Sequence, residues 1–165
     1  MHIGICGMKN GKQNNSVTVH EKQALKRQLV TCLKDDTKRW LSYADENLES
    51  AKVLLESDLY NACLQNAQQS VEKLLKSLLA EMSCKVIKTH SISNLNQAIK
   101  ENGMTVDILE DECDLLDTIY LPSKYPIGSV IPDYQPDSVI CKQCIEIAER
   151  VEVSVKAILT RKGGQ

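Results

Sequence analysis

Apolar residues recur at three- and four-residue steps in four segments of this chain, and that spacing is the period of an α-helix. The first segment follows Asp36, a residue that favours a helix start, and the second runs from Leu59 to about Met82. The third follows Thr105, and the fourth follows Asp137 and ends near residues 161–163. The apolar positions are, in chain order, Trp40, Leu41, Ala44, Leu48, Ala51 and Leu55; Cys63, Ala67, Val71, Leu74, Leu75, Leu78, Leu79 and Met82; Ile108, Leu109, Cys113, Leu116 and Ile119; Ile140, Cys144, Ile147, Val151, Val155 and Ile158.

Shorter signals lie between and before these segments. Ser91 favours the start of a short helix that should stop at Gly103, a residue type that is common just past a helix end. The third long helix should end before Pro122, because residues 121–136 hold all four prolines of the chain and favour a loop. Residues 1–35 form a basic N-terminal arm, which we expect to be partly flexible or helical.

These elements predict an all-α protein, an up-and-down four-helix bundle with an additional short helix. The joint at Ser57 and Asp58 is short, so the first two long helices should pack antiparallel. The 165 residues suit one domain, and we place the bundle at residues 36–162.

Composition narrows the class of protein. The net charge of −2 is uneven, because residues 1–39 carry eight Lys and Arg against three acidic residues and the remainder carries twelve against nineteen. The basic arm is either an ordinary solvated segment or a contact for phosphate. Seven cysteines without the regular spacing of a disulfide scaffold, no signal peptide and no long apolar run predict a cytoplasmic protein with reduced thiols and no membrane span.

Polar residues on the second helix form one candidate site. Gln69, Glu72, Lys73 and Lys76 lie three or four residues apart, so an amide, a carboxylate and two cations share one side of the helix. They form either a solvated face with an internal ion pair or the floor of a polar groove that binds phosphate.

His90 is a second candidate, because it directly precedes a helix start where free backbone amides attract anions. There its ring would hold or protonate a phosphate oxygen, which makes it the candidate catalytic residue. Alternatively, the ring bonds a nearby backbone carbonyl and anchors the loop.

Cys141 and Cys144 have the spacing of half a zinc site, but no second pair accompanies them, so core packing is favoured over metal. No phosphate-loop, dinucleotide-binding or HExxH pattern occurs either, and no cofactor is expected. A third candidate surrounds the prolines, where Tyr120, Lys124 and Tyr125 form either the rim of an anion-binding cleft or a stiff turn.

Several of these segments together resemble the HEPN domain, the "higher eukaryotes and prokaryotes nucleotide-binding" family. The likeness covers about residues 36–160. It is carried by Trp40 with Ala44 and Leu48, by AKVLLESDLYNAC at 51–63, by AQQSVEKLLKSLL at 67–79, by KTHSISNL at 88–95 and by YLPSKYP at 120–126.

The resemblance implies a bundle of four main helices plus a short one, commonly a homodimer, that acts on nucleotides or RNA, often beside a small nucleotidyltransferase in a toxin–antitoxin pair. Some family members cut RNA without metal, using an Arg followed four to six residues later by His. Here Lys124 stands where many members have Arg in an Arg-Tyr-Pro step, and Ser129, Val130 and Ile131 stand where the histidine is expected. Lysine keeps the positive charge but cannot form the bidentate hydrogen bonds that arginine makes to phosphate.

The departure from the family pattern leaves three hypotheses. The first is a nucleotide- or RNA-binding domain that is non-catalytic or weakly catalytic, with the phosphate contacts made by Gln69, Lys73, Lys76, Tyr120, Lys124 and Tyr125. The second is a metal-independent endoribonuclease toxin in which His90 replaces the missing histidine. The third is a helical adaptor that binds another protein.

Overall fold

The computed structural model describes residues 33–84, 88–124 and 135–162, and within them the chain forms five helices and no strand. The helices are α2 (Asp35–Glu56), α3 (Tyr60–Glu81), α4 (Ile92–Glu101), α5 (Glu110–Lys124) and α6 (Ser138–Lys162). The predicted all-α fold with four longer helices and one short helix is therefore confirmed. Most of the N-terminal arm and most of the predicted proline-rich loop, residues 125–134, lie outside the described residues.

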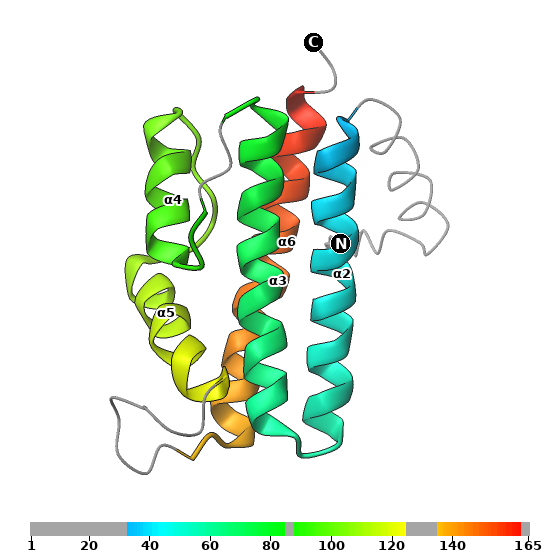
Figure 1. Ribbon diagram of the computed structural model, residues 1–165, viewed down its shortest axis with the longest axis vertical. Coiled ribbons are helices and arrows are strands. Elements are labelled where there is room, and N and C mark those ends of the chain that lie inside the picture. The colour runs from blue at the N-terminus through cyan, green and yellow to red at the C-terminus, as the bar shows by residue number, and fades with distance from the viewer. Residues whose placement is uncertain (1–32, 85–87, 125–134, 163–165) are drawn as a thin grey trace, which may run out of the picture.

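Helices α2 and α3 pack antiparallel, as the short joint predicts (Figure 1). The turn between them includes Asp58 at φ 56°, a left-handed conformation that Asp tolerates better than most residues. At the far end of the pair, the Thr37 hydroxyl donates to the Glu81 carboxylate at 2.6 Å. The pair is therefore fastened at both ends.

Helix α3 lies at the centre of the bundle and contacts each of the other four helices. Figure 1 shows α2 on one side of it, α6 behind it, and α4 above α5 on the other side. Because neighbours surround it, α3 buries polar as well as apolar side chains. Its buried residues are Cys63, Leu64, Ala67, Gln68, Ser70, Val71, Glu72, Leu74, Leu75, Lys76, Ser77, Leu78 and Leu79.

The short helix α4 follows the sequence signals. The Ser91 side chain accepts a hydrogen bond from the Asn94 amide, and Gly103 adopts φ 74° just past the helix end. Helix α6 begins as predicted too, since the Asp137 carboxylate accepts from the amides of Val139 and Ile140, both at 2.9 Å.

The predicted start of α5 is wrong, because the helix begins at Glu110 and not after Thr105. The Asp107 amide donates to the Ser154 hydroxyl of α6 at 3.0 Å, and Val106 and Ile108 are buried in the core. This tertiary packing holds the segment outside a helix. The Leu109 amide then donates to the Glu112 carboxylate at 2.9 Å, which caps the real start.

The predicted end of α5 is also wrong, because the helix continues through Pro122 to Lys124. Proline has no amide hydrogen, so the Thr118 carbonyl loses its usual donor one turn later. In the last turn of a helix this loss affects one bond.

The start of the first helix differs from the prediction by one residue. Helix α2 begins at Asp35, and Asp36 lies in its first turn, where a carboxylate interacts favourably with the helix dipole.

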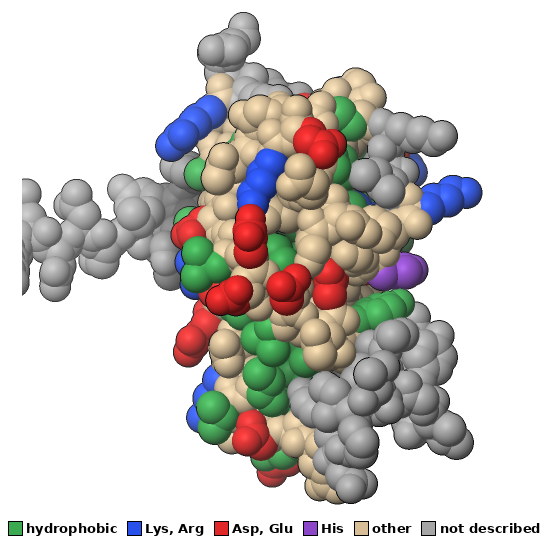
Figure 2. All heavy atoms as spheres, turned by 90° about the vertical axis from the view of Figure 1, so that its left-hand side faces the viewer, with side chains coloured by type: hydrophobic (Ala, Val, Ile, Leu, Met, Phe, Trp, Pro, Cys, Tyr) green, Lys and Arg blue, Asp and Glu red, His purple; other side chains and the backbone are tan. Residues whose placement is uncertain are grey.

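The face of α4 and α5 is acidic. Figure 2 shows Asp and Glu side chains gathered over it, and the exposed ones include Glu101, Asp107, Glu110, Asp111 and Asp114. A surface of this sign repels phosphate. Of the helices described, none combines the length and the apolar character that crossing a bilayer requires.

Candidate functional site

A buried ion pair on α3 is the base of the candidate site. The Lys76 ammonium lies 2.7 Å from Glu72 Oε1 one turn earlier, and the two side chains are only 8% and 7% exposed. The Lys76 ammonium also lies 5.5 Å from the centroid of the Trp40 ring on α2. Burying either charge alone would cost several kcal/mol or more, so each stabilises the other in place. These two residues do not form a solvated face.

The same carboxylate binds His90. His90 Nδ1 lies 3.1 Å from Glu72 Oε2, and the His90 side chain is 63% exposed although Glu72 is buried. An ionised carboxylate only accepts hydrogen bonds, so Nδ1 carries the hydrogen and Nε2 is left as the nitrogen that can accept a proton. A carboxylate, rather than the expected backbone carbonyl, therefore orients the ring.

Two further contacts fix His90. The Gln68 side-chain amide donates to the His90 carbonyl at 3.1 Å, and the imidazole stacks on the Tyr120 ring with the centroids 5.4 Å apart and the planes 14° from parallel. The stack joins a residue of the loop before α4 to a residue of α5. Two of the predicted site residues, His90 and Tyr120, are thus brought together.

The start of α4 is already occupied by a carboxylate. Asp117 of α5 accepts from the Ser93 amide at 3.1 Å and from the Ser91 hydroxyl at 2.8 Å, and the Ile92 amide donates to its other oxygen. These are the amides that were expected to attract an anion beside His90. Because an internal carboxylate fills the positive end of the helix, a ligand phosphate has no free amide there.

Lys73 occupies a different environment from Lys76. Its ammonium donates to the side-chain oxygen of Asn47 and to that of Gln69, the latter at 3.3 Å, and it lies 5.8 Å from the Tyr43 ring centroid. Both bonded partners are neutral. Burial lowers the pKa of Lys73, although the nearby charges of Glu72 and Glu46 oppose that effect.

The row on α2 that faces these lysines was missed by the sequence analysis. Trp40 was assigned to the core stripe and to the family resemblance, and Tyr43 and Asn47 were not singled out. The three residues stand three and four apart, so they share one side of α2. That spacing was the available signal, but it becomes informative only once α2 is known to lie antiparallel against α3.

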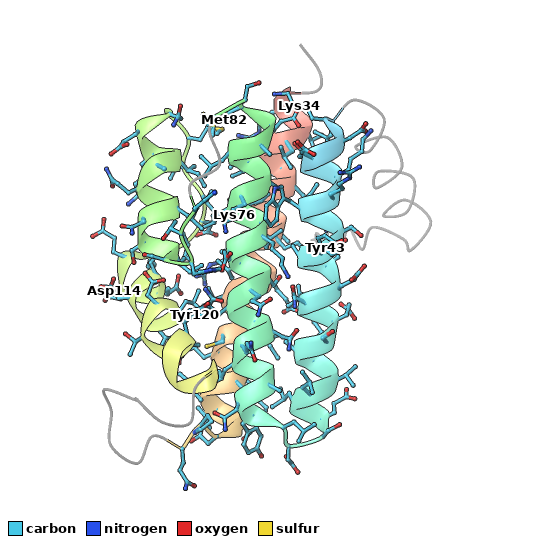
Figure 3. The ribbon with its side chains drawn as sticks, viewed as in Figure 1. Lys34, Tyr43, Lys76, Met82, Asp114 and Tyr120 are labelled. Carbon is cyan, nitrogen blue, oxygen red and sulfur yellow. The ribbon has the colours of Figure 1, made fainter. Side chains whose placement is uncertain are left out.

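The described part of the site lies on one face of the bundle. Figure 3 shows Tyr43 on the α2 side of α3, Tyr120 on the α5 side, and Lys76 between them. Lys124 is the last residue of α5, one turn after Tyr120, but its side chain lies outside the description. Tyr125 lies wholly outside the described residues.

The cysteine pair on α6 belongs to the core, as favoured from the sequence. Cys141 and Cys144 are fully buried, and burial raises the pKa of each thiol to about 12. Such thiols are almost entirely protonated at neutral pH, and therefore inert. Within the described residues, no three His, Cys, Asp or Glu side chains are grouped so that they could hold a metal ion.

Comparison with known proteins gives the family. The HEPN domain model matches residues 37–158, which is most of the chain and spans nearly all of the five described helices. The chain belongs to the HEPN domain family. A comparison with functionally curated proteins found no match.

Two solved structures share the fold of this HEPN domain. The crystal structure of TT1696 from Thermus thermophilus is 26% identical, with a TM-score of 0.64, and the match covers 75% of this chain and 98% of that one. ST0689, an archaeal HEPN homologue, is 25% identical, with a TM-score of 0.56, covering 74% and 97%. The bundle described here is therefore nearly the whole of each of those chains.

The shared carboxylate yields a stability prediction. Glu72→Gln leaves the Lys76 charge buried without its partner, so we expect the free energy of unfolding to fall by about 3–5 kcal/mol in urea titrations. Glu72→Gln combined with Lys76→Met removes the stranded charge and should recover much of that loss. Glu46→Gln, an exposed change on α2, is the control, and an equal loss in the single and double variants would contradict the assignment.

Proposed function

We propose that this HEPN domain binds a nucleotide or single-stranded RNA on the face of α3 that lies between α2 and α5, with little or no catalysis. The observation that carries the proposal is Lys73, a half-buried cation that no described carboxylate neutralises and that lies beside an exposed tyrosine ring. A cation next to aromatic rings suits a phosphate with its base, because bases stack on rings of this kind.

The surroundings of Lys73 support the same assignment. Lys76 with Trp40 repeats the pairing of a cation with a ring one turn along the bundle, and His90 with Tyr120 adds a second aromatic edge. The acidic face of α4 and α5 would exclude a polyanion from that side (Figure 2). Lys124 and Tyr125 remain proposed contacts, because Lys124 follows Tyr120 by one turn of helix.

Trp40 is the single tryptophan of the chain, so its fluorescence reports on this face directly. We expect ATP or a short single-stranded RNA to quench it on titration. Lys73→Gln should weaken binding by roughly tenfold or more, since a hydrogen bond to a charged group contributes about 1.5–3 kcal/mol.

Lys52→Gln is the matched control, because Lys52 bonds Glu49 and Glu149 away from this face, and its loss should leave affinity nearly unchanged. Lys124→Ala extends the test to the end of α5. If neither ligand perturbs Trp40 and calorimetric titration gives no heat, the proposal is wrong.

The bond between Glu72 and His90 favours one alternative function, metal-independent cleavage of RNA. A buried carboxylate that orients an exposed imidazole leaves Nε2 able to take a proton from a ribose 2′-hydroxyl. The arrangement supplies the acid–base group that the sequence lacks at residues 129–131.

This alternative predicts that the purified protein cuts RNA in the presence of EDTA and that His90→Ala abolishes the cut. His90→Ala should leave the fold intact, because the ring is largely exposed and Glu72 keeps its bond to Lys76. Gel analysis of labelled RNA is the measurement. An inert protein, or full activity in His90→Ala, would exclude the ribonuclease.

We further propose that the domain acts in the cytoplasm as a homodimer, beside a nucleotidyltransferase partner in a toxin–antitoxin pair. The support is the family together with the free thiols of the described cysteines. Light scattering coupled to size exclusion should give twice the chain mass of 18.4 kDa at micromolar concentration. A monomer mass would contradict the dimer.

A further inference from the structure

The environment of Lys73 differs from that of two other lysines, Lys52 and Lys156. Lys52 bonds the carboxylates of Glu49 and Glu149 at 3.1 and 3.0 Å, and Lys156 bonds Asp45 and Glu152. For both, burial opposes the charge, but the carboxylates outweigh it and raise the pKa. For Lys73 burial prevails and the pKa is lowered.

The contacts of Lys73 explain the difference. Within the described residues its ammonium has two bonded partners, the side-chain oxygens of Asn47 and Gln69, and the Tyr43 ring below it. Amide oxygens accept a hydrogen bond from a neutral amine as well as from a charged one. The site therefore tolerates loss of the proton, whereas the carboxylates around Lys52 and Lys156 do not.

We propose that Lys73 is a site of covalent acylation, at which the neutral amine takes a small acyl group from an acyl phosphate. The Lys73 nitrogen attacks the acyl carbon and a C–N bond forms. The C–O bond to phosphate breaks, inorganic phosphate leaves with the electron pair, and the proton from nitrogen passes to water.

The surroundings fit the product as well as the reaction. The new amide keeps one N–H, which can donate to Asn47, and Gln69 is part-exposed and can turn to water. The acyl methyl can rest on the Tyr43 ring, which is 57% exposed. Acylation removes the cation from this face, so its effect on ligand binding, unlike the acylation itself, rests on the proposed function.

The test is the rate of acetylation of the full-length protein by limiting acetyl phosphate at pH 8, measured at each lysine by peptide mass spectrometry. We expect Lys73 to react about threefold faster than Lys52, or more, since the unprotonated fraction of an amine rises as its pKa falls. Lys52 is the internal reference because its side chain is 36% exposed, so access to it does not limit the comparison.

Gln69→Glu separates basicity from access. It places a carboxylate where the amide oxygen now lies 3.3 Å from the Lys73 nitrogen, with almost no change in shape. Lys73 should then slow to about the rate of Lys52, while Lys52 itself is unchanged. Asn47→Asp makes the same change from α2 and serves if Gln69→Glu does not fold.

Two results overturn the inference: a wild-type Lys73 that reacts no faster than Lys52, or a rate unchanged by both carboxylate variants. The proposed function is tested apart from it, by repeating the Trp40 titration on the acetylated protein. Preferential acetylation with unaltered nucleotide and RNA binding would leave the modification standing and remove Lys73 from the ligand site. Ligand binding without preferential acetylation of Lys73 would support the proposed function and contradict the acylation.

Discussion

One buried carboxylate holds the candidate site together. Glu72 lies on the central helix, where four other helices leave little access to water, so its charge has to be met inside the protein. It is met from two directions, by Lys76 on the same helix and by His90 from the loop before α4. The orientation of His90, and through its ring the stack on Tyr120, depends on that pairing.

Three carboxylates of this domain stabilise the ends of its helices. Asp117 closes the start of α4, Glu112 closes the start of α5, and Glu81 ties α3 to α2. Each of these carboxylates accepts hydrogen bonds from backbone or hydroxyl donors that would otherwise lack partners. Lys73, by contrast, is bonded to neutral side chains, and both proposals rest on that difference.

The sequence predicted elements best where a local signal agreed with the packing. Ser91, Gly103 and Asp137 mark real helix boundaries because each acts on backbone groups within a few residues of itself. Thr105 and Pro122 led to wrong boundaries for α5, because the surrounding structure overrides the local preference of each residue. The first lies in a segment that α6 holds in another conformation, and the second falls in a last turn, where one missing bond is tolerated.

The candidate site shows the same division. The spacing of Gln69, Glu72, Lys73 and Lys76 placed them on one side of a helix, and the Thr-His step with the tyrosines indicated the family, so both were accessible from the residues alone. The residues alone did not show which lysine Glu72 would neutralise, because Glu72 lies within one turn of both Lys73 and Lys76. The antiparallel register of α2 sets Asn47 and Tyr43 against Lys73 and Trp40 against Lys76.

By itself, then, the sequence determined the helices and the fold class, since a helical period and its caps are local properties of the chain. Only the tertiary structure decided which charges are buried, which carboxylate orients His90 and which cation remains available. Burial and pairing are set by neighbours that are distant in sequence, and the free energy of a charge depends on those neighbours far more than on its own identity.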